Sequence, residues 1–112
     1  NGKNKNIKIF HQNIQNLQSR IEPLQIVLDE IDPHIIVLSE HDMRSHDIDR
    51  LNINNYRVTS YFCREKSNKG GVIILSKEQI EWTQVAIHLP KNLCEEKQFE
   101  FCATLFLFKN FK

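Results

Sequence analysis

The sequence has little of what marks the specialised protein classes. It carries only three cysteines, Cys63, Cys94 and Cys102, without a C-x-x-C pair, which argues against a disulfide framework or a standard structural zinc site. Its longest apolar runs span a few residues, well short of the roughly 20 needed to cross a bilayer. No apolar stretch follows the N-terminal lysines, so no signal peptide is visible. We therefore expect an intracellular protein, nuclear or cytoplasmic, without a membrane partner.

The sequence also has no excess of positive or negative charge. The 112 residues include 15 basic and 14 acidic side chains, a formal net charge of +1, which gives no global electrostatic reason to expect a nucleic acid or an anionic membrane. Any such partner must be recognised locally. The length and the 40% hydrophobic content are those of one ordinary globular domain. Because the chain starts without Met and stops within FLFKNFK, we expect it to belong to a longer protein.

The first third of the chain has the pattern of a strand, a helix and a second strand. Residues 7–11 predict a strand, after a polar segment, residues 1–6, that we expect to be disordered. Residues 35–39 are apolar on both faces, as in a strand covered on both sides. The helix between them is predicted from apolar residues at helical steps: Ile21, Leu24, Leu28 and Ile31, with Ile26 and Val27 widening the apolar face. Asp32-Pro33 should end this helix.

Such a βαβ unit places polar side chains together at one edge of the sheet. The two strands of the unit are expected to be parallel, so Asn13 and Glu40, which follow them, should emerge at the same C-terminal edge. Open α/β sheets bind ligands at that edge. Glu40 offers a hard carboxylate ligand suited to Mg²⁺, and Asn13 offers an amide oxygen and N–H groups. The alternative is that both are ordinary polar residues at strand ends and turns.

The rest of the chain has the alternation of antiparallel strands. Residues 56–64 and 71–76 predict a hairpin joined by a polar, glycine-ended loop, and residues 83–89 and 99–108 predict two further strands. Arg64, Lys66 and Lys69 in the hairpin loop could contact a phosphate backbone, although such lysines are usually only soluble surface. Gly70-Gly71 lacks the spacing of a phosphate-binding motif, which favours a turn.

Histidines and acidic residues after the second strand permit a second, weaker hypothesis. They could form a transition-metal cluster or general acid and base groups, but the spacing is poor and no nucleophile is evident nearby. The residues concerned are His11, His41, His46, Asp42 and Asp47.

Three segments together resemble a known family. They are IKIFHQNIQNL, IDPHIIVLSEH and NKGGVIIL, and their order and spacing are similar to those in the N-terminal half of an endonuclease/exonuclease/phosphatase (DNase I-like) domain of non-LTR (LINE-type) retrotransposons. The resemblance covers nearly all of residues 1–112. It implies an α/β (α+β) fold, a four-layered α/β sandwich of which this chain is the N-terminal half.

The resemblance also implies a site and an activity. It assigns Glu40 as a ligand of Mg²⁺, with Mn²⁺ as a substitute, and Asn13 as a second catalytic and metal-binding residue. The complete domain would hydrolyse phosphodiester bonds of DNA and nick a target site, with a reverse transcriptase further along the parent polyprotein. The family's other catalytic motifs would follow Lys112, so this chain alone is expected to be inactive.

Two points keep other hypotheses open. Asp42 stands where retrotransposon relatives often have an aromatic residue. A non-catalytic α/β module that contacts a protein or a nucleic acid is the main alternative, and a zinc-binding module is a third.

Overall fold

The computed structural model of the chain describes residues 7–78, 82–87 and 103–108. Their order is β1 (Ile9–Asn13), the 3₁₀ helix η1 (Leu17–Arg20), α1 (Ile21–Ile31), β2 (Ile35–Ser39), α2 (Ser45–Ile48), β3 (Tyr56–Phe62), β4 (Val72–Lys77), β5 (Trp82–Ile87) and β6 (Ala103–Phe108). The segment expected to be disordered, residues 1–6, lies outside the described residues, as do the ends of the two strands predicted at 83–89 and 99–108.

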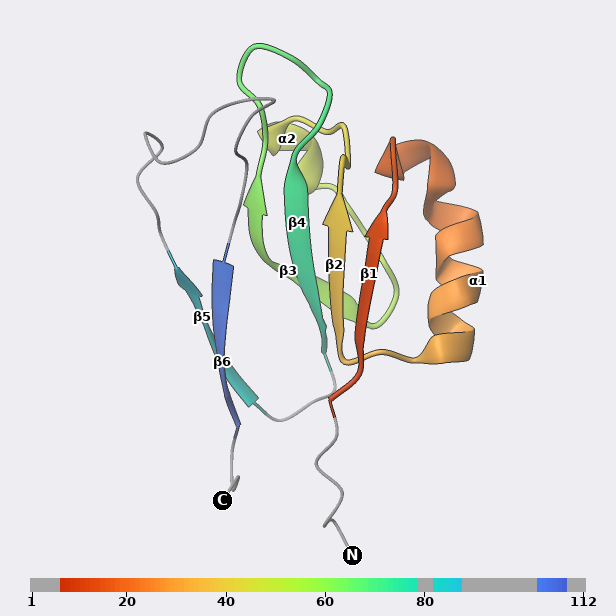
Figure 1. The fold of residues 1–112 in the computed structure, drawn as a ribbon, viewed down its shortest axis with the longest axis vertical. Helices are drawn as coiled ribbons and strands as arrows, with labels where there is room; N and C mark the ends of the chain where they lie inside the picture. Colours follow the sequence, from red (N-terminus) through yellow and green to blue (C-terminus); the bar gives the residue numbers. More distant parts are fainter. Residues whose placement is uncertain (1–6, 79–81, 88–102, 109–112) are drawn as a thin grey trace, which may run out of the picture.

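The strands form a four-stranded mixed sheet and a two-stranded one (Figure 1). In the larger sheet the order is β1-β2-β4-β3, with β1 parallel to β2 and the other neighbours antiparallel. β5 and β6 pair antiparallel and contact β3. The predicted α/β fold class is confirmed, and so are the parallel first pair and the hairpin of β3 and β4.

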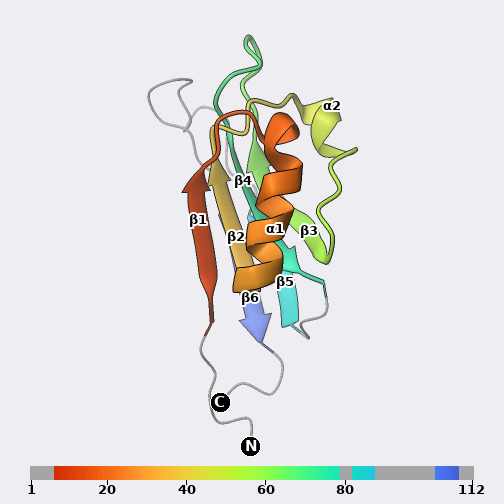
Figure 2. The same cartoon turned by 90° about the vertical axis from the view of Figure 1, so that its right-hand side faces the viewer.

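Both helices cover the same face of the larger sheet (Figure 2). That face carries the buried side chains of β2 and β4, and they form one core with residues of α1 and α2: Leu24, Leu28, Ile36, Leu38, Ile48, Ile73 and Leu75. Burying a leucine or isoleucine side chain contributes about 1.5–3 kcal/mol. This core holds β2 in place, and β1 pairs with β2, so the core determines where the two strand ends lie. No helix in the described part of the chain is long and apolar enough to cross a bilayer.

The apolar face of α1 is narrower than the sequence predicts. Leu24 and Leu28 are buried, but 69% of Ile26 and 39% of Val27 are exposed. Ile26 lies two positions from both leucines, which is about 200° around a helix of 3.6 residues per turn, so it points away from the core. The expectation that Ile26 and Val27 widen the buried face was therefore wrong.

β1 and the short helix α2 differ most from what the sequence predicts. β1 runs from Ile9 to Asn13 rather than over residues 7–11, because its register with β2 pairs Ile9 with Ile35 and Asn13 with Ser39. The short helix α2 lies between β2 and β3, where the sequence pattern predicts no helix. Four residues are too few for a helical period to be recognised, although the Asp47 carboxylate accepts the Arg44 N–H at its start.

Tyr56 links the start of β3 to the end of α1 and carries a pH-dependent part of the stability. Its hydroxyl donates a 2.6 Å hydrogen bond to the Pro33 carbonyl. Burial, followed by the charges of Asp32 and Asp29, raises the pKa of Tyr56 from 10.0 to about 12. Folding therefore favours the protonated phenol.

We expect stability to fall between pH 10 and about 12. In that interval the unfolded chain loses the phenolic proton while the folded chain keeps it, so this contribution is complete below pH 10.0 and is lost as the pH rises. Tyr56→Phe should lose about 1 kcal/mol at neutral pH, from the missing hydrogen bond, and should show a flatter alkaline profile. Urea unfolding at several pH values measures both. Tyr61→Phe, at an exposed tyrosine, is the control and should match the parent.

Candidate active site

The two residues predicted to form the site are in contact. The Asn13 side chain, on the last residue of β1, donates from Nδ2 to the Glu40 Oε2 at 2.8 Å. Asn13 is exposed and Glu40 is partly exposed, so solvent and ligands can reach the pair. Glu40 has a φ of 56° and thus leaves the strand conformation immediately after Ser39. The carboxylate is positioned by this turn as well as by the sheet.

Backbone hydrogen bonds continue past the strand ends and hold three segments side by side. Ile14 donates to the Ser39 carbonyl at 2.9 Å and Asn16 to that of Glu40 at 3.1 Å. The segment after β2 is also bonded to the end of the β3–β4 loop. The Glu40 N–H donates to the Gly71 carbonyl at 2.6 Å, and the Asp42 N–H donates to the Gly70 carbonyl at 2.8 Å. The backbone that carries the site is therefore held by hydrogen bonds, although it lies beyond the regular strands.

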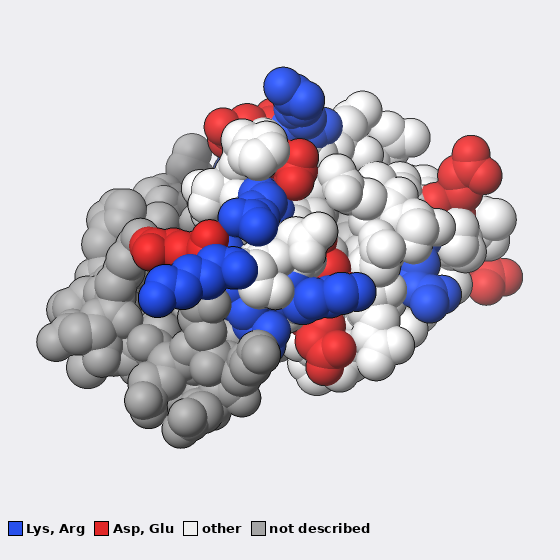
Figure 3. All heavy atoms as spheres, turned by 90° about the horizontal axis from the view of Figure 1, so that it is seen from above, with Lys and Arg blue, Asp and Glu red and all other residues white. Residues whose placement is uncertain are grey.

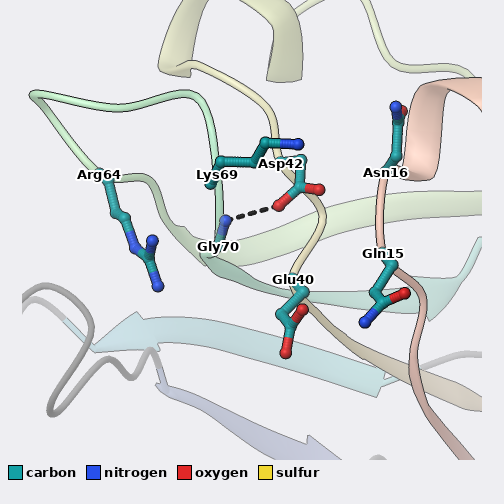
Figure 4. Close-up of a pocket in the computed structure, with 7 residues that line it drawn as sticks. All are labelled: Gln15, Asn16, Glu40, Asp42, Arg64, Lys69 and Gly70. Carbon is teal, nitrogen blue, oxygen red and sulfur yellow. Dashed lines mark hydrogen bonds between the residues drawn. The ribbon is translucent and has the colours of Figure 1, made fainter.

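These three segments, together with the loop between β3 and β4, line an open pocket of about 410 Å³ (Figure 4). Its lining consists of Gln15, Asn16, Glu40, Asp42, Arg64, Lys69 and Gly70. Five of these seven residues have a positive φ, namely Gln15, Asn16, Glu40, Asp42 and Gly70. Glycine adopts this conformation freely, and Asn and Asp adopt it more readily than other residues do. The strained positions are therefore Gln15 and Glu40, and strain of this kind clusters at functional sites.

The histidines proposed as a metal or acid-base cluster do not come together. His41 is fully buried; its Nδ1 accepts the Met43 N–H at 3.0 Å, so the ring proton lies on Nε2, which is 2.9 Å from the Phe62 carbonyl. His46 is exposed beside Asp47, and His11 is exposed on β1. Across the described ranges, no three His, Cys, Asp or Glu side chains group closely enough to hold a metal ion. His41 is a structural residue.

The hairpin loop between β3 and β4 contributes the positive side of the pocket. Of its three basic residues, Arg64 and Lys69 line the pocket, and Lys66 is not among the lining residues. The turn predicted at Gly70-Gly71 is present, with φ values of 79° and 88°. Figure 3, which views the molecule from this end, shows basic and acidic side chains next to one another. The sequence indicated the loop's charge but not its position beside Glu40.

The donors at Asn13 and Glu40 fit a small, hard cation. The hydrogen bond between them uses an amide N–H of Asn13 and one carboxylate oxygen, while Oε1 of Glu40 and Oδ1 of Asn13 are oxygen donors of the type that Mg²⁺ prefers. In proteins Mg²⁺ typically keeps several waters and takes one or two carboxylates together with substrate phosphates. One carboxylate and one amide would therefore hold such an ion only together with waters and a substrate phosphate.

The fold and the pocket define an α/β protein with an acidic site at the C-terminal edge of its parallel strands. The family model described as the Endonuclease/Exonuclease/phosphatase family matches residues 11–109. The chain therefore belongs to this family, whose members are hydrolases of the nuclease and phosphatase type. The resemblance drawn from the three sequence segments is confirmed at the level of the family. No curated protein matches the chain.

Proposed function

We propose that this chain is the N-terminal part of a divalent-metal-dependent endonuclease that hydrolyses phosphodiester bonds of DNA. The observation that supports this most is the 2.8 Å contact of Asn13 with Glu40 at the C-terminal sheet edge, in a chain that belongs to a hydrolase family. Mg²⁺ is the proposed ion and Mn²⁺ the expected substitute, because both oxygen donors are hard.

The roles of the two residues follow from their chemistry. The Glu40 carboxylate would supply the negative ligand, and the Asn13 amide, which donates to it, would fix its orientation. The bound metal would neutralise charge that develops on the scissile phosphate. In the described part of the chain the pocket has no histidine or further carboxylate besides Asp42. The Asp42 carboxylate already accepts the Gly70 N–H, so the group that deprotonates water would come from outside the described residues.

The biological setting proposed is that of a LINE-type retrotransposon. The three matching segments of the sequence support it, and DNA is then the substrate and a reverse transcriptase the expected neighbour in the same polyprotein. Such an enzyme would act inside the cell, where chromosomal DNA is available. The alternative remains a non-catalytic α/β module that keeps the fold and contacts nucleic acid through the same pocket.

Plasmid nicking separates these two functions. The 112-residue chain alone should nick supercoiled DNA in Mg²⁺ no faster than its Glu40→Gln variant, because one carboxylate holds Mg²⁺ weakly and the base is missing. The same chain, continued through its natural reading frame, should nick in a metal-dependent manner. Lack of nicking by the continued protein in both Mg²⁺ and Mn²⁺ would reject the endonuclease and favour the binding module. Nicking by the short chain that Glu40→Gln abolishes would instead place the whole site within these residues.

A further inference from the structure

Asp42 lines the pocket but has no part in the proposed chemistry. It comes two residues after Glu40 and is partly buried. Its carboxylate accepts the Gly70 N–H at 2.5 Å (Figure 4). Its own N–H donates to the Gly70 carbonyl at 2.8 Å. Asp42 therefore binds both the N–H and the carbonyl of Gly70.

The backbone of Glu40 needs support, because its φ of 56° is unfavourable for a residue with a Cβ atom. Such a conformation persists only where the surrounding structure holds it. The Glu40 N–H donates to the Gly71 carbonyl at 2.6 Å, and the Glu40 carbonyl accepts the Asn16 N–H at 3.1 Å. The first of these hydrogen bonds ends on the residue that follows Gly70.

The contacts of Asp42 therefore reach Glu40 through two glycines. Gly70 and Gly71 have φ values of 79° and 88°, which glycine adopts without the steric cost that other residues incur. The same freedom means that these glycines do not hold the conformation by themselves. An acceptor for the Gly70 N–H restricts it, and a fixed Gly70 places the Gly71 carbonyl within reach of the Glu40 N–H.

We propose that Asp42 is a positioning residue, whose carboxylate holds Gly70 and thereby fixes the backbone turn that presents Glu40 to the pocket. This inference rests on the proposed function, in which Glu40 is the metal ligand. Groups that orient a metal ligand typically account for about 10- to 100-fold in metal affinity or activity. The role requires a hydrogen-bond acceptor at position 42 but no negative charge, which distinguishes it from a second metal ligand or a general base.

Two substitutions separate the hydrogen bond from the charge. Asp42→Asn removes the charge but keeps an acceptor oxygen, and asparagine tolerates a left-handed conformation such as the φ of 57° at Asp42. Asp42→Gly removes the acceptor without adding backbone strain. Asp49→Ala is the control for charge, because Asp49 is exposed at the end of α2 and outside the pocket lining.

Hydrogen exchange of the metal-free 112-residue chain, followed by NMR, measures the hold on Glu40 directly. In Asp42→Gly the amides of Glu40 and Gly70 should exchange about 10-fold faster than in the parent, whereas Asp42→Asn and Asp49→Ala should stay within about threefold. The amides of Ile73 and Leu75 on the interior strand β4 are the reference, since a general loss of stability would speed their exchange as well. Unchanged exchange at Glu40 in Asp42→Gly would overturn the proposal.

Nicking by the continued protein measures the consequence for the site. Asp42→Gly should raise the Mg²⁺ concentration needed for half-maximal nicking about 10-fold, and Asp42→Asn should stay within about threefold of the parent. An Asp42→Asn variant as impaired as Asp42→Gly would show that the charge is required and would overturn the positioning role. An Asp42→Gly variant with the rate and Mg²⁺ dependence of the parent would overturn it too.

The two measurements separate this proposal from the proposed function. If the continued parent protein does not nick, the endonuclease is rejected, and hydrogen exchange alone decides whether Asp42 positions Glu40. If a thermal melt shows that Asp42→Gly does not fold, Asp42→Glu takes its place, because it keeps the charge but moves the acceptor by one methylene. A positioning role predicts a larger loss in Asp42→Glu than in Asp42→Asn, and the reverse order would contradict it.

Discussion

Glu40→Gln should reduce metal-dependent nicking by the continued protein about 10²- to 10³-fold. Gln keeps the size of the side chain and an oxygen that can accept the Asn13 N–H, so the 2.8 Å contact can survive. The charge that holds the metal is lost. Removing a single group that stabilises transition-state charge typically costs that much in rate. The initial rate of conversion from supercoiled to open-circular plasmid measures the effect.

A matched control shows whether the loss of activity is specific to Glu40 or follows from the loss of any carboxylate. Glu30 is exposed on α1, away from the pocket lining, and Glu30→Gln makes the same chemical change. This variant should nick at the parent rate and bind Mn²⁺ as the parent does. If Glu40→Gln retained more than about a tenth of the rate while folded, its proposed role as metal ligand would be wrong. The Asn13–Glu40 contact would then be a structural one.

The position of Asn13 and Glu40 at one edge of the sheet was predictable from the sequence, because only the order and direction of two strands determine it. A strand, a helix and a strand within a short span give parallel neighbours, and residues that follow such strands lie at one edge. The register that pairs Asn13 with Ser39 confirms that argument. The contact between Asn13 and Glu40 required one more feature, the positive φ of Glu40, and no sequence rule assigns that conformation to a glutamate.

The basic side of the pocket was not predictable in the same way. Arg64 and Lys69 are near Glu40 only because the loop returns over the end of β2 and is held there by Asp42 and Gly70. These contacts join residues 28 positions apart, and they depend on backbone conformations rather than on a periodic pattern. The role of Asp42 as an acceptor for the loop also offers a physical reason for an acidic residue at a position where an aromatic one was expected.

His41 illustrates a third case, in which the sequence favoured no single role. A histidine after a buried strand can be a metal ligand, a base or a core residue, and its spacing to other histidines was uninformative. The structure assigns both ring nitrogens to backbone groups, those of Met43 and Phe62. His41 therefore connects the segment after β2 to the end of β3. It lies against Gly71 and does not line the pocket.

Gly71→Ala should be the most destabilising single substitution near the pocket, by about 3 kcal/mol. Gly71 has a φ of 88°, and an added Cβ would lie 2.5 Å from the His41 Nε2 and 2.7 Å from the Phe62 carbonyl oxygen. The conformation alone costs about 1–3 kcal/mol, and overpacking adds about 1–3 kcal/mol. His41 cannot move away easily, because it is fully buried and hydrogen-bonded at both nitrogens.

Urea unfolding of the 112-residue chain, followed by circular dichroism, measures this loss. Asn68→Ala is the control, because Asn68 is exposed in the same loop and its truncation should change the free energy of unfolding by less than about 0.5 kcal/mol. A Gly71→Ala chain as stable as the parent would show that the loop can leave His41 at no cost, and the argument that this backbone fixes the basic side of the pocket would fail.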